Sequence, residues 1–465
     1  MRSWDAARVA AAAGATLLAQ PSGRHAQGGP SRAVIDSRRV GAGELFVGLQ
    51  GERADGGEHA LEALAAGAWG ALVAPDHAAD AAAATATWTS GSGAVLAHVQ
   101  PLGAMQSLAR SWRRELGRGG ARLVGITGST GKTSTKDILA ALLEVHRRVV
   151  CSPENLNTEI GLPLAILAAP AGTQALVVEM AMRGAGQIAE LAAIAEPDVG
   201  VIVKVGPVHL ERLGSLEAIA AAKAELIAGM RAGAKVVVPA GERLLERHLR
   251  ADVDTITFGD GGDVSLQQAS RGRVLLSAFG ESLELRPSFS QAHNLQNLLA
   301  AVAAALALGI EPRELAAQAS LTVRFSALRG ERLALAGGVV VINDCYNANP
   351  MSMRAAIDDL AETAPARRVA VLGDMLELGP QAARLHREVG LYAADAGVDV
   401  LIAVGSLAAG MRSEFEGESY AVADAAAAVE QLEMLLCEGD TVLVKGSRGV
   451  GLERVAETLG AARAR

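Results

Sequence analysis

Short apolar runs alternate with longer alanine-rich or amphipathic stretches along the chain, and this pattern first describes a small amino-terminal region. In a region that we end at residue 97, apolar runs predict strands at 45–49, 71–74 and 94–99. The apolar stretch 9–18 is expected to form an amphipathic first helix and not a signal peptide, because Asp5 and Arg8 precede it. A helix is expected at 60–66, and 79–87 is interpreted as a helix or a loop of low complexity.

A second region, 98–326, begins with a predicted helix at 101–116 and then alternates strands with helices. Strands are expected at 122–126, 175–179, 199–205 and 235–239, and helices at 215–230 and 298–310. Such alternation is typical of a largely parallel sheet with helices on both faces. Between 264 and 285 the polar-apolar period becomes short, which indicates an antiparallel edge or hairpin.

The third region, 327–465, repeats the α/β pattern. Its predicted strands lie at 339–342, 369–372, 400–404 and 441–444, and they are separated by helices. The run is complete enough to fold as its own domain, and Gly330, Gly337 and Gly338 make a hinge plausible near its start. The fold class is therefore α/β with three domains.

The strand at 122–126 leads into a glycine-rich turn that is typical of phosphate binding. Backbone N–H groups of such a turn and of the following helix point at the anion, and a lysine adds positive charge. A threonine after the lysine can offer its hydroxyl to Mg²⁺. Ile126 stands where the general motif has its first glycine, but the flanking strand and helix argue against a chance match. The segment predicts ATP or GTP binding and comprises Thr127, Gly128, Ser129, Thr130, Gly131, Lys132, Thr133 and Ser134.

Composition narrows the class of protein. The chain has 465 residues, enough for about three domains. Aromatic residues make up only 3% and the formal net charge is −8, which argues against a nucleic-acid partner. The three cysteines form neither a disulfide framework nor a zinc pattern. The apolar helix at 298–310 is too short to span a bilayer. We expect a cytoplasmic enzyme with no membrane span.

Three side chains that could do chemistry follow strands of the second region. Glu179 ends a strand, where a carboxylate often completes the Mg²⁺ shell beside a phosphate loop, although a helix cap or surface charge is more common. His209 follows the next strand, and an isolated histidine is more often structural or solvated. Lys223 lies on the helix at 215–230, where a solvated lysine is the usual expectation. Ligands gather at the carboxyl ends of parallel strands, which favours a functional role for Glu179 and His209.

Two asparagines and two polar turns complete the candidates. Asn294 and Asn297, three residues apart on a helix, share a face and could pair with adenine; a helix N-cap at Asn294 is about equally plausible. The polar turn 343–350 follows the first strand of the third region, and the turn 373–379 follows the second. Both could be ordinary loop chemistry, because Asn and Pro favour turns.

In this order, the motifs resemble those of Mur ligases, the ATP-dependent amide-forming enzymes of peptidoglycan precursor synthesis. The resemblance covers nearly the whole chain, and the turns 346–350 and 373–379 point to the D-alanyl-D-alanine-adding branch. It rests further on 36–39, 43–47, 51–53, 127–133, 155–163, 209–211 and 223–225. One departure is Asp55-Gly56-Gly57, where the family commonly has Asp-Gly-His, and this puts one contact of the amino-terminal module in doubt.

The resemblance implies a small α/β amino-terminal module that binds the UDP substrate (1–97), a central P-loop parallel-sheet ATPase domain (98–326) and a Rossmann-like carboxyl-terminal ligase domain (327–465). It implies two Mg²⁺ ions and a carbamate on Lys223 formed with CO₂. The implied metal ligands are Thr133, Glu179, His209 and Lys223, and the catalytic residues are Lys132, His209 and Lys223.

The resemblance also implies binding residues. Adenine and ribose would be held by Asn294, Asn297 and Asp344, and Arg329 would reach the phosphates, with Arg332 as the alternative. The implied substrate-binding residues are Ser37, Arg38, Phe46, Asn157, Thr158, Tyr346, Asn347 and Asn349.

The implied reaction is ATP-dependent addition of D-alanyl-D-alanine to UDP-N-acetylmuramoyl-tripeptide through an acyl phosphate, by a monomer. Another ligase of the same fold, either a sister amino-acid-adding enzyme or folylpolyglutamate synthase, is the nearer alternative. The turn 346–350 and the uridine-like amino-terminal module argue against folate. A nucleotide-switched regulator of the GTPase type is the more distant one. The chain has no Asn-Lys-x-Asp guanine-reading motif, which disfavours that class.

Overall fold

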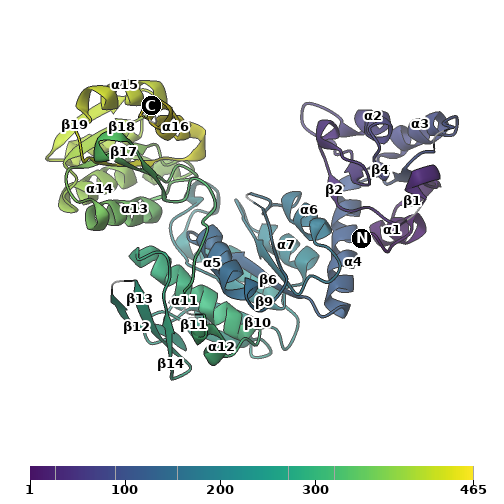
Figure 1. Ribbon diagram of the computed structural model, residues 1–465, viewed down its shortest axis with the longest axis horizontal. Coiled ribbons are helices and arrows are strands. Elements are labelled where there is room, and N and C mark those ends of the chain that lie inside the picture. Colours follow the sequence, from purple (N-terminus) through teal and green to yellow (C-terminus); the bar gives the residue numbers. More distant parts are fainter. Residues whose placement is uncertain (27, 90, 154, 271, 319, 464–465) are drawn as a thin grey trace.

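The computed structural model describes residues 1–463 except 27, 90, 154, 271 and 319, and it contains three sheets in succession along the chain. The first and third sheet regions lie on either side of the central one and well apart from each other (Figure 1). This mixed α/β architecture confirms the expected fold class. Among the described residues, no helix combines the length and the apolar character needed to cross a membrane.

The amino-terminal sheet has the order β1-β5-β4-β3-β2, with β1 antiparallel to β5 and the other pairs parallel. The helix expected at 9–18 is wrong in its second half. It ends at Gly14, whose φ of 67° is left-handed, and the following residues form strand β1. The elements are α1 (Ala6–Ala13), β1 (Thr16–Ala19), β2 (Ala33–Val34), β3 (Leu45–Val47), α2 (Ala60–Ala65), β4 (Gly70–Val73), α3 (Pro75–Thr85) and β5 (Ala94–Ala97).

The central sheet has nine strands in the order β14-β13-β12-β11-β10-β9-β6-β8-β7. Pairing is parallel from β7 to β12 and antiparallel through β13 and β14, so the predicted parallel sheet and antiparallel edge are both confirmed. The strand expected at 199–205 is shorter. The strands are β6 (Arg122–Thr127), β7 (Val149–Cys151), β8 (Ala175–Glu179), β9 (Val199–Ile202), β10 (Lys235–Pro239), β11 (Asp254–Phe258), β12 (Val264–Ser270), β13 (Arg273–Ala278) and β14 (Glu281–Leu285).

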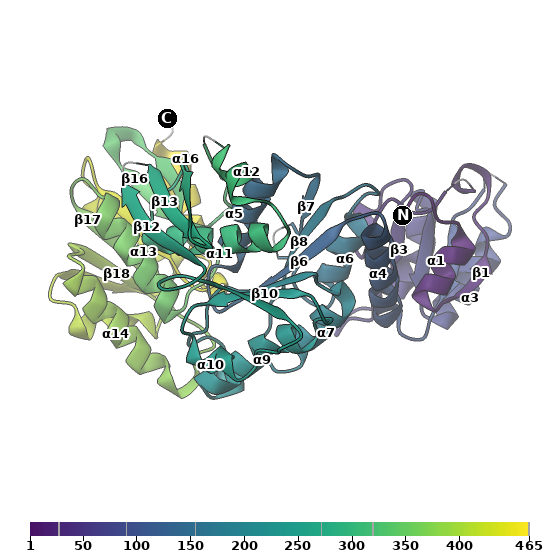
Figure 2. The same ribbon diagram turned by 90° about the horizontal axis from the view of Figure 1, so that it is seen from below.

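Helices cover both faces of this sheet, because successive residues of a buried strand point to opposite sides. Leu123 joins one apolar core and its neighbour Val124 joins the other. Figure 2 shows α7, α9 and α10 on one side of the sheet and α5, α11 and α12 on the other. The helices are α4 (Pro101–Arg118), α5 (Lys132–Glu144), α6 (Gly161–Ala168), α7 (Gln187–Ala195), α8 (Leu210–Leu213), α9 (Leu216–Ala228), α10 (Arg243–Glu246), α11 (Ala292–Ala307) and α12 (Pro312–Ala316).

The carboxyl-terminal sheet has the order β15-β16-β20-β17-β18-β19 and is parallel except for the hairpin β15–β16. Gly337 and Gly338 form the turn of this hairpin, so they are not a hinge between domains. The elements are β15 (Glu331–Ala334), β16 (Val340–Asn343), α13 (Pro350–Thr363), β17 (Arg368–Gly373), α14 (Ala382–Asp395), β18 (Val400–Val404), β19 (Glu418–Val422), α15 (Ala425–Leu435), β20 (Thr441–Lys445) and α16 (Glu453–Arg463).

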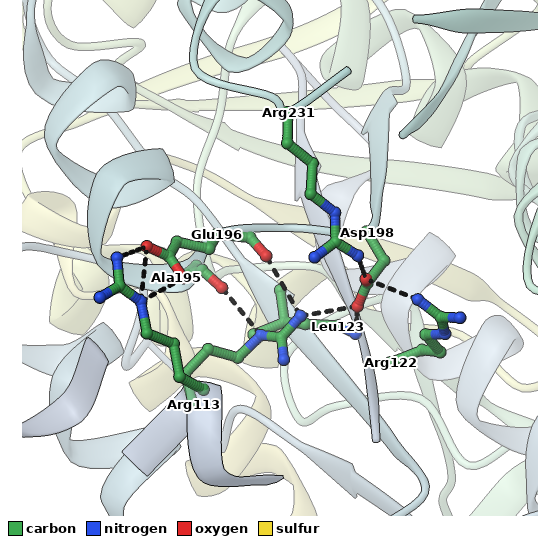
Figure 3. Close-up of polar contacts among 8 residues, drawn as sticks. Arg113, Arg122, Leu123, Ala195, Glu196, Asp198 and Arg231 are labelled. Atoms are coloured by element: carbon green, nitrogen blue, oxygen red, sulfur yellow. Dashed lines mark hydrogen bonds and ion pairs between the residues drawn. The ribbon is translucent and has the colours of Figure 1, made fainter. Parts of the chain in front are cut away.

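The amino edge of the central sheet is closed by a cluster of charges around Asp198, which immediately precedes β9 (Figure 3). Its carboxylate accepts hydrogen bonds from the buried guanidinium of Arg113 at 2.6 Å, from Arg122 at 3.1 Å and from the backbone N–H of Leu123 at 2.7 Å. Arg231 donates to the same carboxylate. Burial lowers the pKa of Arg113, and Asp198 opposes that shift. The cluster ties α4 to the first residues of two neighbouring strands.

Candidate active site

The glycine-rich turn follows β6 at the carboxyl edge of the central sheet, as the sequence predicted, and α5 begins at Lys132. Gly131 precedes this helix with a φ of 79°, a left-handed value that glycine adopts without strain. A Cβ there would lie 2.3 Å from Oδ1 of Asn297, so the turn also needs glycine to fit against α11. The turn is thus in direct contact with the helix that carries both candidate asparagines.

Thr133 and Glu179 meet at this edge. The Thr133 hydroxyl donates to Oε2 of Glu179 at 2.8 Å, and Nδ2 of Asn157 donates to the other carboxylate oxygen at 3.0 Å. Glu179 is 2% exposed. Mg²⁺ prefers oxygen ligands and commonly takes one or two carboxylates together with substrate phosphates and waters, so this donor set fits the ion. No group of three or more His, Cys, Asp or Glu side chains forms a ready-made metal cage in the described part of the chain.

Two lysines lie close enough for their charges to interact, and Lys132 also interacts with the charge of Glu179. Lys132 Nζ donates to the carbonyl of Gly128 at 2.9 Å, and burial lowers its pKa; Glu179 opposes the shift and Arg329 adds to it. Lys223 of α9 is 2% exposed, so the interpretation of a solvated helix lysine is wrong. Its ammonium has no hydrogen bond or ion pair to any described residue. Burial, and then the charge of Lys132, hold its pKa well below the usual value.

The loop after β9 carries His209 to the same region. Ser129 anchors this loop, because its hydroxyl donates to the carbonyl of Gly206 at 2.9 Å and accepts from the Gly206 N–H at 2.9 Å. His209 then adopts a φ of 53° and its Nδ1 lies 2.5 Å from Oε2 of Glu377. Burial lowers the pKa of His209, although the Glu377 carboxylate opposes that shift. Glu377 was not predicted as a site residue, and its place in the turn 373–379 was the only signal.

Asn294 and Asn297 point to one face of α11, as their spacing predicted. Both are buried, and Nδ2 of Asn297 donates to Oδ1 of Asn294 at 3.2 Å. The helix N-cap is Gln291, and Asn294 lies inside the helix. The N-cap interpretation of Asn294 is therefore wrong.

Arg329 reaches the phosphate loop from the start of the third region. Its Nη2 donates to the Thr133 hydroxyl at 3.2 Å, and its guanidinium lies 3.9 Å from the centre of the Tyr346 ring. Its Nε is buried without a hydrogen-bond partner among the described residues. Arg332, the alternative, instead contacts Asp359 at 2.7 Å and Thr363 at 2.9 Å. The geometry thus favours Arg329 as the cation near the phosphates.

Three turns of the carboxyl-terminal domain converge at the ends of its central strands. Buried Lys445 donates to Oδ2 of Asp344 at 2.6 Å and to the carbonyl of Asn347 at 3.0 Å. The Ser447 hydroxyl accepts from the N–H of Leu376 at 2.9 Å, which joins the turn 445–451 to the turn 373–379. Lys445 and Ser447 were missed, although the Lys-Gly-Ser-Arg-Gly sequence after an apolar strand was a usable signal.

Several predicted substrate-binding residues have structural partners in this arrangement. Asn349 caps α13 and exchanges hydrogen bonds with Ser352, and Oδ1 of Asn347 accepts from the N–H of Ala348 at 2.8 Å. The Thr158 hydroxyl accepts from the N–H of Gly161 at the start of α6. Their roles as substrate ligands stay predictions.

The amino-terminal candidates lie in the first sheet region, away from the phosphate loop. The hydroxyl of Ser37 is 3.4 Å from Glu62, and the guanidinium of Arg38 binds Asp36 at 2.9 Å, both at the surface. Phe46 is 1% exposed and belongs to the core of this region.

The unusual Gly57 has a local explanation. A Cβ at this position would lie 2.3 Å from Cδ2 of His77, and Nε2 of that histidine lies 2.9 Å from the Asp55 carboxylate. The pairing with His77 is the main reason why the pKa of Asp55 is lowered. His77 thus occupies the space next to Asp55 that a residue-57 side chain would need.

Comparison with known proteins gives a consistent picture. Residues 126–305 match the Mur ligase middle domain, and residues 328–448 match the Mur ligase, glutamate ligase domain. The chain is 38% identical to UDP-N-acetylmuramoyl-tripeptide–D-alanyl-D-alanine ligase of Mycobacterium tuberculosis over 91% of each chain. A crystal structure of MurF from Acinetobacter baumannii matches 98% of this chain and 99% of its own with a TM-score of 0.85 at 26% identity. The MurF ligase of Thermotoga maritima, solved in complex with ADP, matches 92% and 97% with a TM-score of 0.77 at 30% identity.

Proposed function

Because the chain belongs to the Mur ligase family, we propose that it uses ATP to join D-alanyl-D-alanine to UDP-N-acetylmuramoyl-tripeptide, a step of peptidoglycan precursor synthesis. The observation that carries the proposal is the contact between the two domains at the phosphate loop. Thr133 of the central domain binds Glu179 at 2.8 Å and also receives Arg329 from the carboxyl-terminal domain at 3.2 Å. The substrate assignment is supported by relatives that match along nine-tenths of the chain.

The proposed chemistry has two steps, and ADP and phosphate are its products. A carboxylate acylates poorly, so its oxygen first attacks the γ-phosphorus of ATP; the bond to ADP breaks and an acyl phosphate forms. The neutral amine of D-alanyl-D-alanine then attacks the acyl carbon, loses a proton, and phosphate leaves with the electron pair of the broken C–O bond. Lys132 and Arg329 are placed to hold negative oxygens of the transferring group. The amide that forms makes this a C–N bond-forming ligation.

The proposal includes two Mg²⁺ sites. Thr133 and Glu179 would hold one ion, and His209 together with a carbamate on Lys223 would support the other. Bound Mg²⁺ would neutralise negative charge on the phosphates. The residues fit because the Glu179 carboxylate is buried near Lys132 and has only Thr133 and Asn157 as side-chain hydrogen-bond partners among the described residues.

The surroundings of Lys223 support the proposed carbamate. The neutral amine is the reactive form: its nitrogen attacks the carbon of CO₂, a C–N bond forms and a proton is released. Burial beside Lys132 lowers the pKa of Lys223 and so favours that neutral amine. The product is an anion beside the cation Lys132, which removes the like-charge repulsion.

The remaining assignments extend the same proposal. The UDP-muramoyl peptide would contact Ser37, Arg38 and Phe46 of the module 1–97. The central domain would run from 98 to 326 and the carboxyl-terminal domain from 327 to 465. Asn294, Asn297 and Asp344 would hold the adenosine. The reacting ends of the substrates would lie near Asn157, Thr158, Tyr346, Asn347 and Asn349. We place the enzyme in the cytoplasm, in keeping with its three free cysteines, and propose separately that it acts as a monomer.

A phosphate-release assay tests the function. The purified chain is mixed with ATP, Mg²⁺, D-alanyl-D-alanine and a panel of UDP-muramoyl peptides that end before, at or after the third residue. Release is expected only with the tripeptide and D-alanyl-D-alanine together, and mass spectrometry should detect the pentapeptide product. Turnover with UDP-muramoyl-dipeptide and a diamino acid would instead identify a sister ligase. Turnover with a folate and glutamate would identify folylpolyglutamate synthase.

A further inference from the structure

His209 and Glu377 form a close pair between the central and carboxyl-terminal domains. Nδ1 of His209 is 2.5 Å from Oε2 of Glu377, and the His209 side chain is 22% exposed. Both residues have left-handed backbone angles, with φ of 53° and 62°. Left-handed conformations of residues other than glycine are uncommon and persist where the surroundings hold them. The pair is therefore built by its two loops and is not a chance meeting of long side chains.

The backbones beside this pair are also in contact. The N–H of Glu211 points to the carbonyl of Glu377 at 3.4 Å, and a Cβ on Gly379 would lie 3.1 Å from Cα of Glu211. The short helix α8 thus packs directly on the turn 377–379. Glu377 reaches His209 only when the carboxyl-terminal domain sits on the central domain in this way.

The chemistry of the contact fixes which imidazole nitrogen is available. A carboxylate only accepts hydrogen bonds, so Nδ1 of His209 carries the hydrogen. The lone pair of the neutral ring then lies on Nε2. Histidines that bind metals commonly donate their other N–H to a carboxylate, which sets the tautomer and the orientation of the ring. The contact between His209 and Glu377 supplies the outer carboxylate of such an arrangement.

We propose that Glu377 is a positioning residue that makes Nε2 of His209 the metal-binding nitrogen, and that docking of the carboxyl-terminal domain thereby completes the second metal site. This inference rests on the role of His209 in the proposed function. It adds that metal affinity and domain docking are coupled: whatever strengthens one strengthens the other by the same factor.

Titration of Mn²⁺ into the full chain with saturating ADP, followed by electron paramagnetic resonance of the free ion, measures the coupling. The variants are Glu377→Ala, Glu377→Gln, His209→Ala and the double variant His209→Ala/Glu377→Ala. We expect Glu377→Ala to weaken one Mn²⁺ site by about 10- to 100-fold, the usual effect of losing such an outer partner. Glu377→Gln keeps an acceptor oxygen and should fall between Glu377→Ala and the unmodified chain. In the His209→Ala background, Glu377→Ala should change Mn²⁺ affinity less than twofold.

Arg183 supplies the matched control. Its Nε lies 3.8 Å from Oε1 of Glu377, the oxygen that does not face His209. Arg183→Gln removes the other partner of the same carboxylate, so it should leave Mn²⁺ affinity within twofold. An equal loss from Arg183→Gln and Glu377→Ala would mean that the carboxylate only ties the domains together, and the inference would fail.

The outcomes separate the inference from the proposed function. If His209→Ala loses a Mn²⁺ site but Glu377→Ala and Glu377→Gln do not, the inference about Glu377 is wrong and the proposed function is unaffected. Unchanged Mn²⁺ binding in His209→Ala overturns the assignment of His209 as a ligand and the inference with it, whereas phosphate release still tests the reaction. If Glu377→Ala does not fold, Glu377→Gln decides, because it preserves size and backbone preference.

Discussion

At the amino edge of the central sheet, Asp198 accepts hydrogen bonds from Arg113 at 2.6 Å, from Arg122 at 3.1 Å, from a third arginine and from a backbone N–H (Figure 3). At the carboxyl edge, Lys132 and Lys223 lie close together and have far fewer partners among the described residues. Both edges belong to the same strands, β6 and β9, and both bury charged groups. At the carboxyl edge the hydroxyl of Thr127 and Nε of Arg329 are also buried without partners in the described structure.

We infer that the difference separates charges that stabilise the fold from charges that a bound ligand would satisfy. A buried charge whose hydrogen bonds are complete holds elements together, and removing one partner is strongly destabilising. Buried polar atoms that stay incomplete are unfavourable unless an incoming anion or metal satisfies them. Asp198 belongs to the first kind, and Lys132, Lys223 and Arg329 belong to the second.

Removing Asp198 is the strongest test of this contrast. Asp198→Ala leaves the buried Arg113 guanidinium without its carboxylate, so we expect the free energy of unfolding to fall by about 3–5 kcal/mol. Urea denaturation followed by circular dichroism measures this. Glu284→Ala, which breaks the exposed pair with Arg273, is the control and should change little. A loss no larger than that of the control would place Asp198 among the dispensable charges.

Lys132→Ala should do the opposite, by abolishing ligation in a folded protein. Loss of one preorganised electrostatic group commonly lowers the rate by roughly 100-fold or more. The melting temperature should not fall, because Lys132 has only the hydrogen bond to Gly128 in the described structure. Phosphate release and thermal unfolding are measured on the same sample. Near-normal turnover by a folded Lys132→Ala protein would contradict the assignment of the phosphate loop.

Lys223 is tested by both activity and stability. We expect Lys223→Ala to lose most activity, by about 10-fold or more, and acetate or formate to restore part of it by supplying the missing carboxylate. Arginine should not substitute, because it keeps the positive charge. In CO₂-free buffer, where Lys223 is a free amine, Lys223→Met should raise stability by about 1 kcal/mol, since a buried amine that must lose its proton disfavours folding at neutral pH.

The sign of that stability change follows from proton binding. The pKa of Lys223 is lowered by folding, so between the folded and unfolded pKa values the unfolded chain binds more protons, and stability rises with pH. The advantage of Lys223→Met should therefore shrink as pH rises through that window. An unchanged activity in Lys223→Ala, with no effect of acetate, would return this residue to a structural role.

The two asparagines should show the smallest effects. Asn294→Ala and Asn297→Ala are each expected to weaken ATP binding by about 1 kcal/mol, the value of a typical hydrogen bond. The KM for D-alanyl-D-alanine should stay the same, because the dipeptide is expected in the other domain. Steady-state kinetics with each substrate varied in turn separates the two. If the ATP KM is unchanged in both variants, the pair serves only to pack α11.

Many features of the two edges could be predicted from the sequence, and the predictions that were wrong have physical causes. Spacing alone predicted a phosphate loop at a strand end and two asparagines on one helix face, because strand ends and helical periods are local signals. For Glu179 it gave only the position at a strand end, and the metal role came from the resemblance. The sequence predicted a solvated Lys223, because local pattern does not show which face of its helix becomes buried. That burial depends on which other elements pack over the helix. The predicted first helix extended through Leu18 because alanine periodicity continues, but Gly14 ends that helix and β5 recruits the following residues as a strand.

Contacts between distant segments were beyond prediction from local pattern. The choice between Arg329 and Arg332 depended on which guanidinium reaches Thr133, a contact across 196 positions of the chain. The pairing of His209 with Glu377 likewise joins residues 168 positions apart. The Asp198 cluster was likewise missed, because its arginines come from separate elements with no common motif. Such features depend on tertiary packing, which no single segment encodes.

The close fit of Gly131 against Asn297 also bears on how the protein is made. The glycine-rich loop and α11 are separated by most of the central domain, so a growing chain produces the loop about 8–33 s before Asn297 at ~5–20 residues per second. During that interval the loop lacks its contact with Asn297. On the proposed nucleotide site, ATP would be a late ligand of folding, and at 100 times its Kd it would stabilise the finished domain by about 2.7 kcal/mol.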